Sequence, residues 1–175
     1  MPKLPTILDR FDERFTRWMA RHGVTLLRLA LGIVFLWFGV LKFFPGLSPA
    51  QALATDTIGA LTRGTLDPGL AVLLLAVWET LIGLGLLFGV YLRVTLFLLW
   101  TQMLGTITPL FLFPDQAFTR IPFAPTLEGQ YIIKNVVLVA AGIVIGATVR
   151  GVRPERAPAG AAKRGRGAPS KKEGA

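Results

Sequence analysis

One acidic residue, Glu79, lies where an ionised side chain is costly. It falls near the middle of an apolar stretch at 69–92, and at about 1.5 Å rise per residue it lies about 15 Å from either membrane surface. A carboxylate at that depth cannot reach water, so it must be protonated, paired, or facing a wet cavity. Two interpretations stay open: a paired group that supports the fold, and a proton relay or ligand contact.

Four other polar side chains are candidates for the surroundings of Glu79. Gln102 falls at a similar depth in a neighbouring apolar stretch and is a natural hydrogen-bond partner. Lys42 and Lys134 lie nearer one end of their stretches, where a long chain can either snorkel outward or point inward. The sequence predicts a polar pocket in one half of the protein, formed by Lys42, Glu79, Gln102, Lys134 and Asn135.

The composition excludes several kinds of redox and metal centre. There is no cysteine, so a disulfide, a thiolate nucleophile and a Cys-ligated metal cluster are excluded. The one histidine, His22, argues against a His-rich metal site, and no GxGxxG fingerprint for a nucleotide or flavin is present. We therefore expect no metal and no evident cofactor. No residue is assigned as catalytic, and whether the protein is an enzyme stays open.

Four apolar stretches must position these residues. The chain is 53% hydrophobic and only 17% charged, and a membrane-spanning helix needs about 20 mostly apolar residues. The sequence predicts an all-α fold, a four-helix transmembrane bundle within residues 24–149. Its glycines predict tight helix packing rather than a wide pore. The four predicted spans are about 24–44, 69–92, 94–113 and 130–149.

The distribution of Lys and Arg predicts the orientation in the membrane. Five cations precede the first span and eight follow the last, whereas the two longer loops carry only Arg63 and Arg120. Lys and Arg resist translocation. We therefore expect an integral protein of the plasma or inner membrane with both termini in the cytoplasm.

The two ends of the chain are predicted to lie outside the bundle. Residues 1–23 contain an amphipathic helix, with aromatic side chains on one face and arginines on another, which is typical of a helix at the membrane interface. The tail at 150–175 is basic and lacks bulky apolar residues, so we expect disorder. The expected partners at both ends are anionic lipid head groups rather than nucleic acid, because topology explains most of the net charge of +9.

Short signals predict local structure between the spans. Ser48, followed by Pro49 and by Gln51, is typical of a helix start, which predicts a short helix at about 49–62. Thr126 is placed to cap the fourth span, with Glu128 in its first turn, where the helix dipole favours an anion.

Four strings in the spans resemble the DoxX-like family of small four-helix membrane proteins. The resemblance covers about residues 26–147, and its most specific string is LEGQYIIKN. The others are LRLALGIVFLWFGVLKFFP, WETLIGLGLLFG and MLGTITPLFLFPDQAF. Relatives often carry a histidine beside the methionine of the last string, where this chain has Gln102. The positions that match the family pattern are Lys42, Glu79, Gly105, Thr106, Pro109, Glu128, Gly129, Gln130, Lys134 and Asn135.

The resemblance implies a function in membrane redox chemistry. The family is similar to a subunit of an archaeal thiosulfate:quinone oxidoreductase, and other members are linked to complexes that handle sulfur compounds or oxidative stress. The leading hypothesis is a subunit or accessory of such a complex, with quinone as ligand and a soluble redox enzyme as partner. Two alternatives stay open: transport of a small solute or protons through the pocket around Glu79, in an oligomer if one chain lacks the pathway, and a membrane scaffold for a soluble enzyme.

Overall fold

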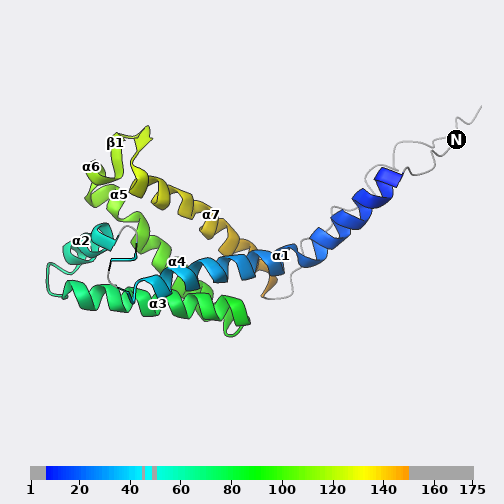
Figure 1. Ribbon diagram of the computed structural model, residues 1–175, viewed down its shortest axis with the longest axis horizontal. Coiled ribbons are helices and arrows are strands. Elements are labelled where there is room, and N and C mark those ends of the chain that lie inside the picture. The colour runs from blue at the N-terminus through cyan, green and yellow to red at the C-terminus, as the bar shows by residue number, and fades with distance from the viewer. Residues whose placement is uncertain (1–6, 45, 49–50, 150–175) are drawn as a thin grey trace, which may run out of the picture.

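The computed structural model describes residues 7–44, 46–48 and 51–149, and this part of the chain is helical apart from one small hairpin (Figure 1). The predicted disorder of the tail at 150–175 concerns residues outside the described part. The helices are α1 (Ile7–Leu41), α2 (Gln51–Leu61), α3 (Pro68–Phe88), α4 (Leu92–Ile107), α5 (Pro109–Leu112), α6 (Pro114–Ala117) and α7 (Leu127–Thr148), and the strands are β1 (Phe118–Arg120) and β2 (Ala124–Pro125).

Four helical segments are long and apolar enough to cross a membrane, which confirms the predicted four-helix bundle. They lie in α1, in α3, in α4 together with α5, and in α7, with mean hydropathies of 2.2, 2.3, 1.4 and 1.9. The third segment is interrupted near its end, because Pro109 has no N–H to continue the α-helical pattern. The N–H of Thr108 instead bonds the carbonyl of Gly105, three residues earlier, at 3.3 Å, which is the pattern of a tightened last turn.

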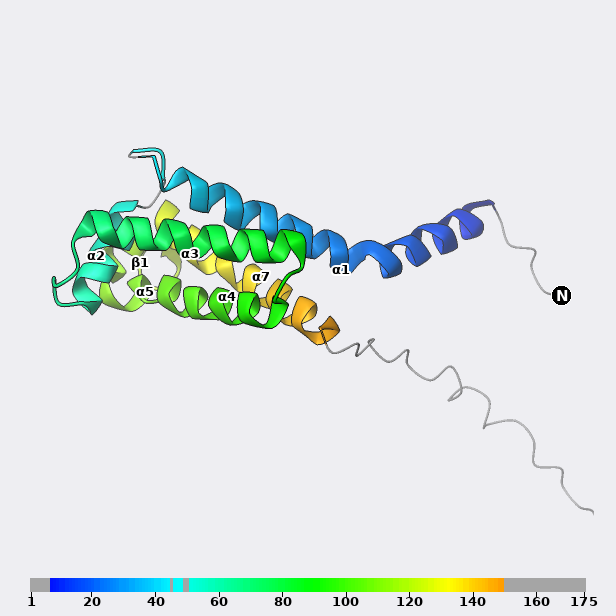
Figure 2. The ribbon, with the colours of Figure 1, turned by 90° about the horizontal axis from the view of Figure 1, so that it is seen from below.

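The first helix is longer than the sequence analysis expects. We expect from the sequence a separate amphipathic helix, followed by a span that starts near residue 24. In the structure α1 runs unbroken for 35 residues. No proline interrupts it, and Gly23 alone costs a helix only about 1 kcal/mol. The helix bends where it leaves the bundle (Figures 1 and 2). On the protruding part, Phe11 and Phe15 are 72% and 51% exposed.

The contact between α1 and α3 is the most extensive in the bundle and depends on glycine. A Cβ added at Gly83 would lie 2.5 Å from the backbone nitrogen of Leu36, and one added at Gly39 would lie 2.7 Å from that of Thr80. Gly32 meets α3 in the same way, one to two turns earlier on α1. The two backbones therefore touch with no side chain between them, as the glycines of the sequence predict.

An arginine of α1 binds the free carbonyls at the C-terminal end of α3. Arg28 donates hydrogen bonds to the carbonyls of Leu86 and Leu87, the second at 3.1 Å. These carbonyls belong to the last turn of α3, which lacks partners within its own helix. The helix then stops at Gly89, whose φ of 68° lies in the left-handed region that favours glycine.

The opposite end of the bundle is covered by α2, α5, α6 and the hairpin (Figures 1 and 2). The helix α2 confirms the short helix expected there, although Pro49 lies outside the described residues. Thr126 caps α7 as predicted: its hydroxyl accepts a hydrogen bond from the N–H of Gly129 at 3.1 Å and donates one to the carbonyl of Gln116 at 2.7 Å. The hairpin of β1 and β2, which the sequence analysis did not predict, leads the chain into that cap.

Replacing Gly83 with alanine should destabilise the bundle, because the added methyl group would meet the backbone of α1. We expect Gly83→Ala to lower the free energy of unfolding by about 1–3 kcal/mol, measured by circular dichroism during denaturant unfolding in micelles. Gly105→Ala is the matched control within another span, since nothing lies within 4 Å of a Cβ added there. Equal stability of the two variants would contradict the close contact.

Candidate functional site

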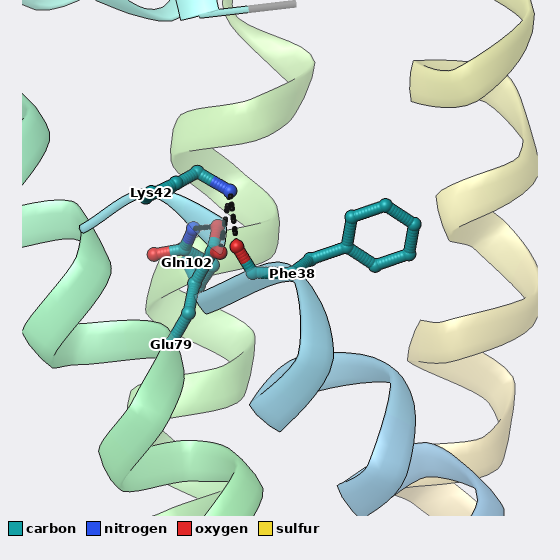
Figure 3. Close-up of polar contacts among 4 residues, drawn as sticks. All are labelled: Phe38, Lys42, Glu79 and Gln102. Atoms are coloured by element: carbon teal, nitrogen blue, oxygen red, sulfur yellow. Dashed lines mark hydrogen bonds and ion pairs between the residues drawn. The ribbon is translucent and has the colours of Figure 1, made fainter. Parts of the chain in front are cut away.

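An ion pair links the end of α1 to the middle of α3. The ammonium of Lys42, one residue beyond α1, lies 2.6 Å from Oε2 of Glu79. The side chains of the two residues are only 12% and 11% exposed. The same ammonium donates to the carbonyl of Phe38 at 3.4 Å (Figure 3). Lys42 thus points into the bundle rather than snorkelling outward, and Glu79 is paired.

Gln102 on α4 supplies the second contact of the carboxylate. Its amide Nε2 donates to Oε1 of Glu79 at 2.9 Å, and Gln102 is itself buried. A carboxylate can only accept hydrogen bonds, so Gln102 must present its NH₂ group here. Both oxygens of Glu79 therefore have a donor, and the three polar side chains join α1, α3 and α4.

The structure explains why these three residues meet. The tight glycine contact brings the end of α1 beside α3 at the level of Glu79, where Gly39 faces Thr80. The short turn after α3 makes α4 antiparallel to it, which returns Gln102 to the same depth. The carbonyl of Phe38 lies in the last turn of α1, where carbonyls lack helical partners and attract a cation.

The three residues line a cavity of about 610 Å³, within the size range of small-molecule sites. Its other walls come from α2, α3, α5 and α7 and are mostly apolar. Four family-pattern positions besides Lys42, Glu79 and Asn135 also line it: Gly105, Thr106, Pro109 and Glu128. Asn135 faces α4 across the cavity, with its Nδ2 3.4 Å from the hydroxyl of Thr106.

Three sequence-selected residues lie away from the cavity. Lys134 is exposed, with its ammonium 5.9 Å from the centre of the Tyr131 ring. It neighbours Asn135 on α7, and adjacent residues of a helix point about 100° apart, so the two cannot both face inward. Gln130 is exposed as well. Gly129 is buried at the start of α7, where an added Cβ would collide with the carbonyl oxygen of Ala117, so its role is packing.

The cavity opens on the side of the bundle. Among its lining residues, Leu74 and Leu81 of α3 are 52% and 54% exposed, and Leu61 at the end of α2 is 58% exposed. Leu74 and Leu81 belong to a predicted span, so this opening faces the layer that lipid tails occupy. A ligand dissolved in the membrane could reach the polar residues without passing through water.

The helix α2 is the part of the site that sequence reasoning missed. Leu53 and Thr57 are buried and line the cavity, and the hydroxyl of Thr57 is satisfied by the carbonyl of Leu53 at 2.6 Å. The sequence predicted a short helix at this place but did not show that it covers a cavity. No group of three or more His, Cys, Asp or Glu that could hold a metal occurs among the described residues.

Comparison with known proteins gives a family match. The family model named DoxX matches residues 23–114, which is more than half of the chain. The match includes the parts of α1, α3 and α4 that carry Lys42, Glu79 and Gln102, and it ends before α7 and the LEGQYIIKN string. No curated protein and no solved structure matches the chain.

Removing one member of the ion pair should cost more than removing both. Lys42→Met strands a buried carboxylate, and we expect it to lower the free energy of unfolding by about 3–5 kcal/mol. Adding Glu79→Gln should restore part of that stability, because no unpaired charge then remains. A double-mutant cycle of denaturant unfolding in micelles measures the coupling.

The exposed pair on α1 provides the control for that cycle. Arg17 and Glu13 lie 3.6 Å apart with side chains 71% and 69% exposed, so Glu13→Gln should change the unfolding free energy by less than about 0.5 kcal/mol. Strict additivity of the Lys42 and Glu79 substitutions would show that the buried contact does not contribute.

Proposed function

This chain belongs to the DoxX family, and we propose that it serves as a quinone-binding subunit of a membrane redox complex. Its four apolar helices make it an integral membrane protein. The observation that carries the proposal is a cavity with largely apolar walls and one concentrated group of hydrogen-bond donors, from Lys42 and Gln102.

The donor set suits the head group of a quinone. A quinone has an apolar ring with two carbonyl acceptors, so it needs donors on an otherwise apolar wall. The ammonium of Lys42 has three N–H groups, of which two contact Glu79 and Phe38. The amide of Gln102 has two, of which one contacts Glu79. Among the described residues, no further acceptor contacts these groups. One N–H of each residue is thus left to bind a ligand carbonyl, while Glu79 holds both donors in place.

The lateral opening supports a ligand that travels within the membrane. Quinones dissolve in the hydrocarbon layer, and the exposed leucines at the mouth of the cavity offer no polar barrier to an isoprenoid tail. A water-soluble solute would meet this apolar mouth at a cost. The position of the opening therefore favours the quinone hypothesis over transport of a polar solute.

Electrons in this proposal come from a partner. The chain has no cysteine and one histidine, so it supplies neither the thiolates that hold an iron–sulfur cluster nor a pair of histidines for haem. A soluble redox enzyme would supply the electrons, and this chain would bind and orient the quinone that receives them.

Binding of a decyl-substituted benzoquinone should be saturable and should depend on the volume of the cavity. Trp78 lines the cavity, so quenching of its fluorescence reports occupancy in a background where the other three tryptophans are replaced by phenylalanine. We expect Gly105→Leu to weaken binding at least about 10-fold, or 1.4 kcal/mol, because Gly105 lines the cavity and has open space at its Cβ. Gly59→Leu is the matched control, since Gly59 has equal space but lies outside the cavity.

A second comparison tests the donors. Among variants that elute as folded protein, Lys42→Met should bind the quinone more weakly than Lys134→Met, which removes an exposed cation. Quenching that never saturates, or equal binding by these two variants, would overturn the quinone assignment. Solute flux into liposomes that disappears in Glu79→Gln would favour transport instead.

We also propose which end of the bundle faces the cytoplasm. It is the end where α1 enters the bundle and α7 finishes, as the positive-inside rule indicates. The chain lacks cysteine, so single substitutions report sidedness directly. A membrane-impermeant maleimide added to intact cells should label Phe123→Cys, at a hairpin position that is 89% exposed. It should label Glu13→Cys only after the cells are opened. The reverse pattern would invert the topology.

A further inference from the structure

A second cavity lies between α4 and α7, at the end of the bundle opposite α2. Its volume is about 440 Å³, and none of its lining residues takes part in the first cavity. The first turns of α4 contribute one wall and the last turns of α7 the other. The lining side chains include Arg93, Leu96 and Trp100 of α4, with Ile143 and Gly146 of α7.

The cavity is polar at one end and apolar along its length. Arg93 lies in the first turn of α4 and is the charged residue among the described residues that line the cavity. Trp100 lies seven residues deeper, about 10 Å along the helix at 1.5 Å per residue. Arg93 is exposed and makes no hydrogen bond or ion pair with any other described residue. Its guanidinium therefore keeps its donors for a ligand.

Glycine creates the space between the two helices. A Cβ added at Gly146 would lie 3.4 Å from a methyl group of Leu96 and 3.8 Å from the ring of Trp100. A larger side chain at this position would project into the cavity. The groove is thus an apolar slot that runs inward from the guanidinium of Arg93.

We propose that this groove binds one anionic phospholipid from the leaflet at that end of the bundle. The phosphate would bond the guanidinium of Arg93, which offers planar, paired donors that match phosphate oxygens. One acyl chain would lie along Leu96, Trp100 and Gly146. Basic pockets between membrane helices on the cytoplasmic side are a recurrent kind of site for anionic head groups.

The dimensions favour a lipid over a helix of a second copy. A helix about 10 Å across fills about 800 Å³ for every 10 Å of its length. The cavity holds only about 440 Å³, so a helix does not fit inside it. An acyl chain is far thinner than a helix. A second copy would also bring its own basic end, including Arg28 and Arg93, to the same level. Like charges at close range would oppose that contact.

Lipid retention by the full chain tests the proposal. The purified protein in mild detergent is titrated with phosphatidylglycerol or phosphatidylcholine of identical acyl chains, and native mass spectrometry counts the bound lipids. We expect one tightly retained phosphatidylglycerol per chain. Arg93→Gln should reduce its retention at least about 5-fold and abolish the preference over phosphatidylcholine, whereas Arg93→Lys should keep part of that preference.

Two further variants separate this site from general charge and from a dimer contact. Arg63→Gln removes a cation at the opposite end and should leave retention unchanged. Gly146→Leu should reduce retention of both lipids, because it fills the slot. Equal retention by Arg93→Gln and the wild type, or equal losses in the Arg93 and Arg63 variants, would overturn the site. Dimers that Gly146→Leu disrupts while lipid retention persists would assign the groove to a second copy.

Quinone binding gives an independent readout. The two cavities share no lining residue, so Arg93→Gln should leave the quenching of Trp78 by the benzoquinone unchanged. The lipid-retention measurements therefore test the lipid site independently of the outcome for the quinone.

Discussion

A carboxylate in the middle of a membrane span must find donors inside the protein, and the arrangement of this bundle follows from that constraint. Bare ions in hydrocarbon are expensive, and their attraction strengthens as water is removed. Glu79 meets the constraint by pairing with Lys42 on one side and Gln102 on the other. Each donor comes from a different helix, so satisfying one side chain fixes the relative positions of three spans.

The pairing in turn requires close helices. The long chain of Lys42 reaches Glu79 because α1 and α3 touch backbone to backbone through Gly39 and Gly83. Larger residues there would push the helices apart and leave the carboxylate stranded. On the other side of Glu79 lies the cavity, and α2 forms one of its walls. Glu79 thus lies between a closely packed helix pair and an open volume.

The sequence predicts the parts of this structure that depend on local rules. Apolar length predicts the four spans, a threonine before a helix predicts the cap of α7, and equal depth predicts the contact of Gln102 with Glu79. The features that the sequence does not predict depend on how a helix is rotated about its axis and on contacts between elements far apart in the chain. The depth of Lys134 is compatible with the pocket, but its rotation about α7 is set by the packing of Asn135. Likewise, α2 becomes a wall of the cavity only through its contact with α3 and α5.

The unbroken first helix connects two regions that perform different tasks. Its exposed aromatic segment and the turn before Lys42 belong to one hydrogen-bonded rod of 35 residues, about 50 Å long at 1.5 Å per residue. A bend can absorb sideways motion of the protruding segment, but a helix shortens or lengthens very little along its axis. The distance along this axis between the exposed aromatic segment and the turn before Lys42 is therefore fixed by the helix itself. The protruding part of α1 and the buried ion pair are thus held in register by one continuous set of backbone hydrogen bonds.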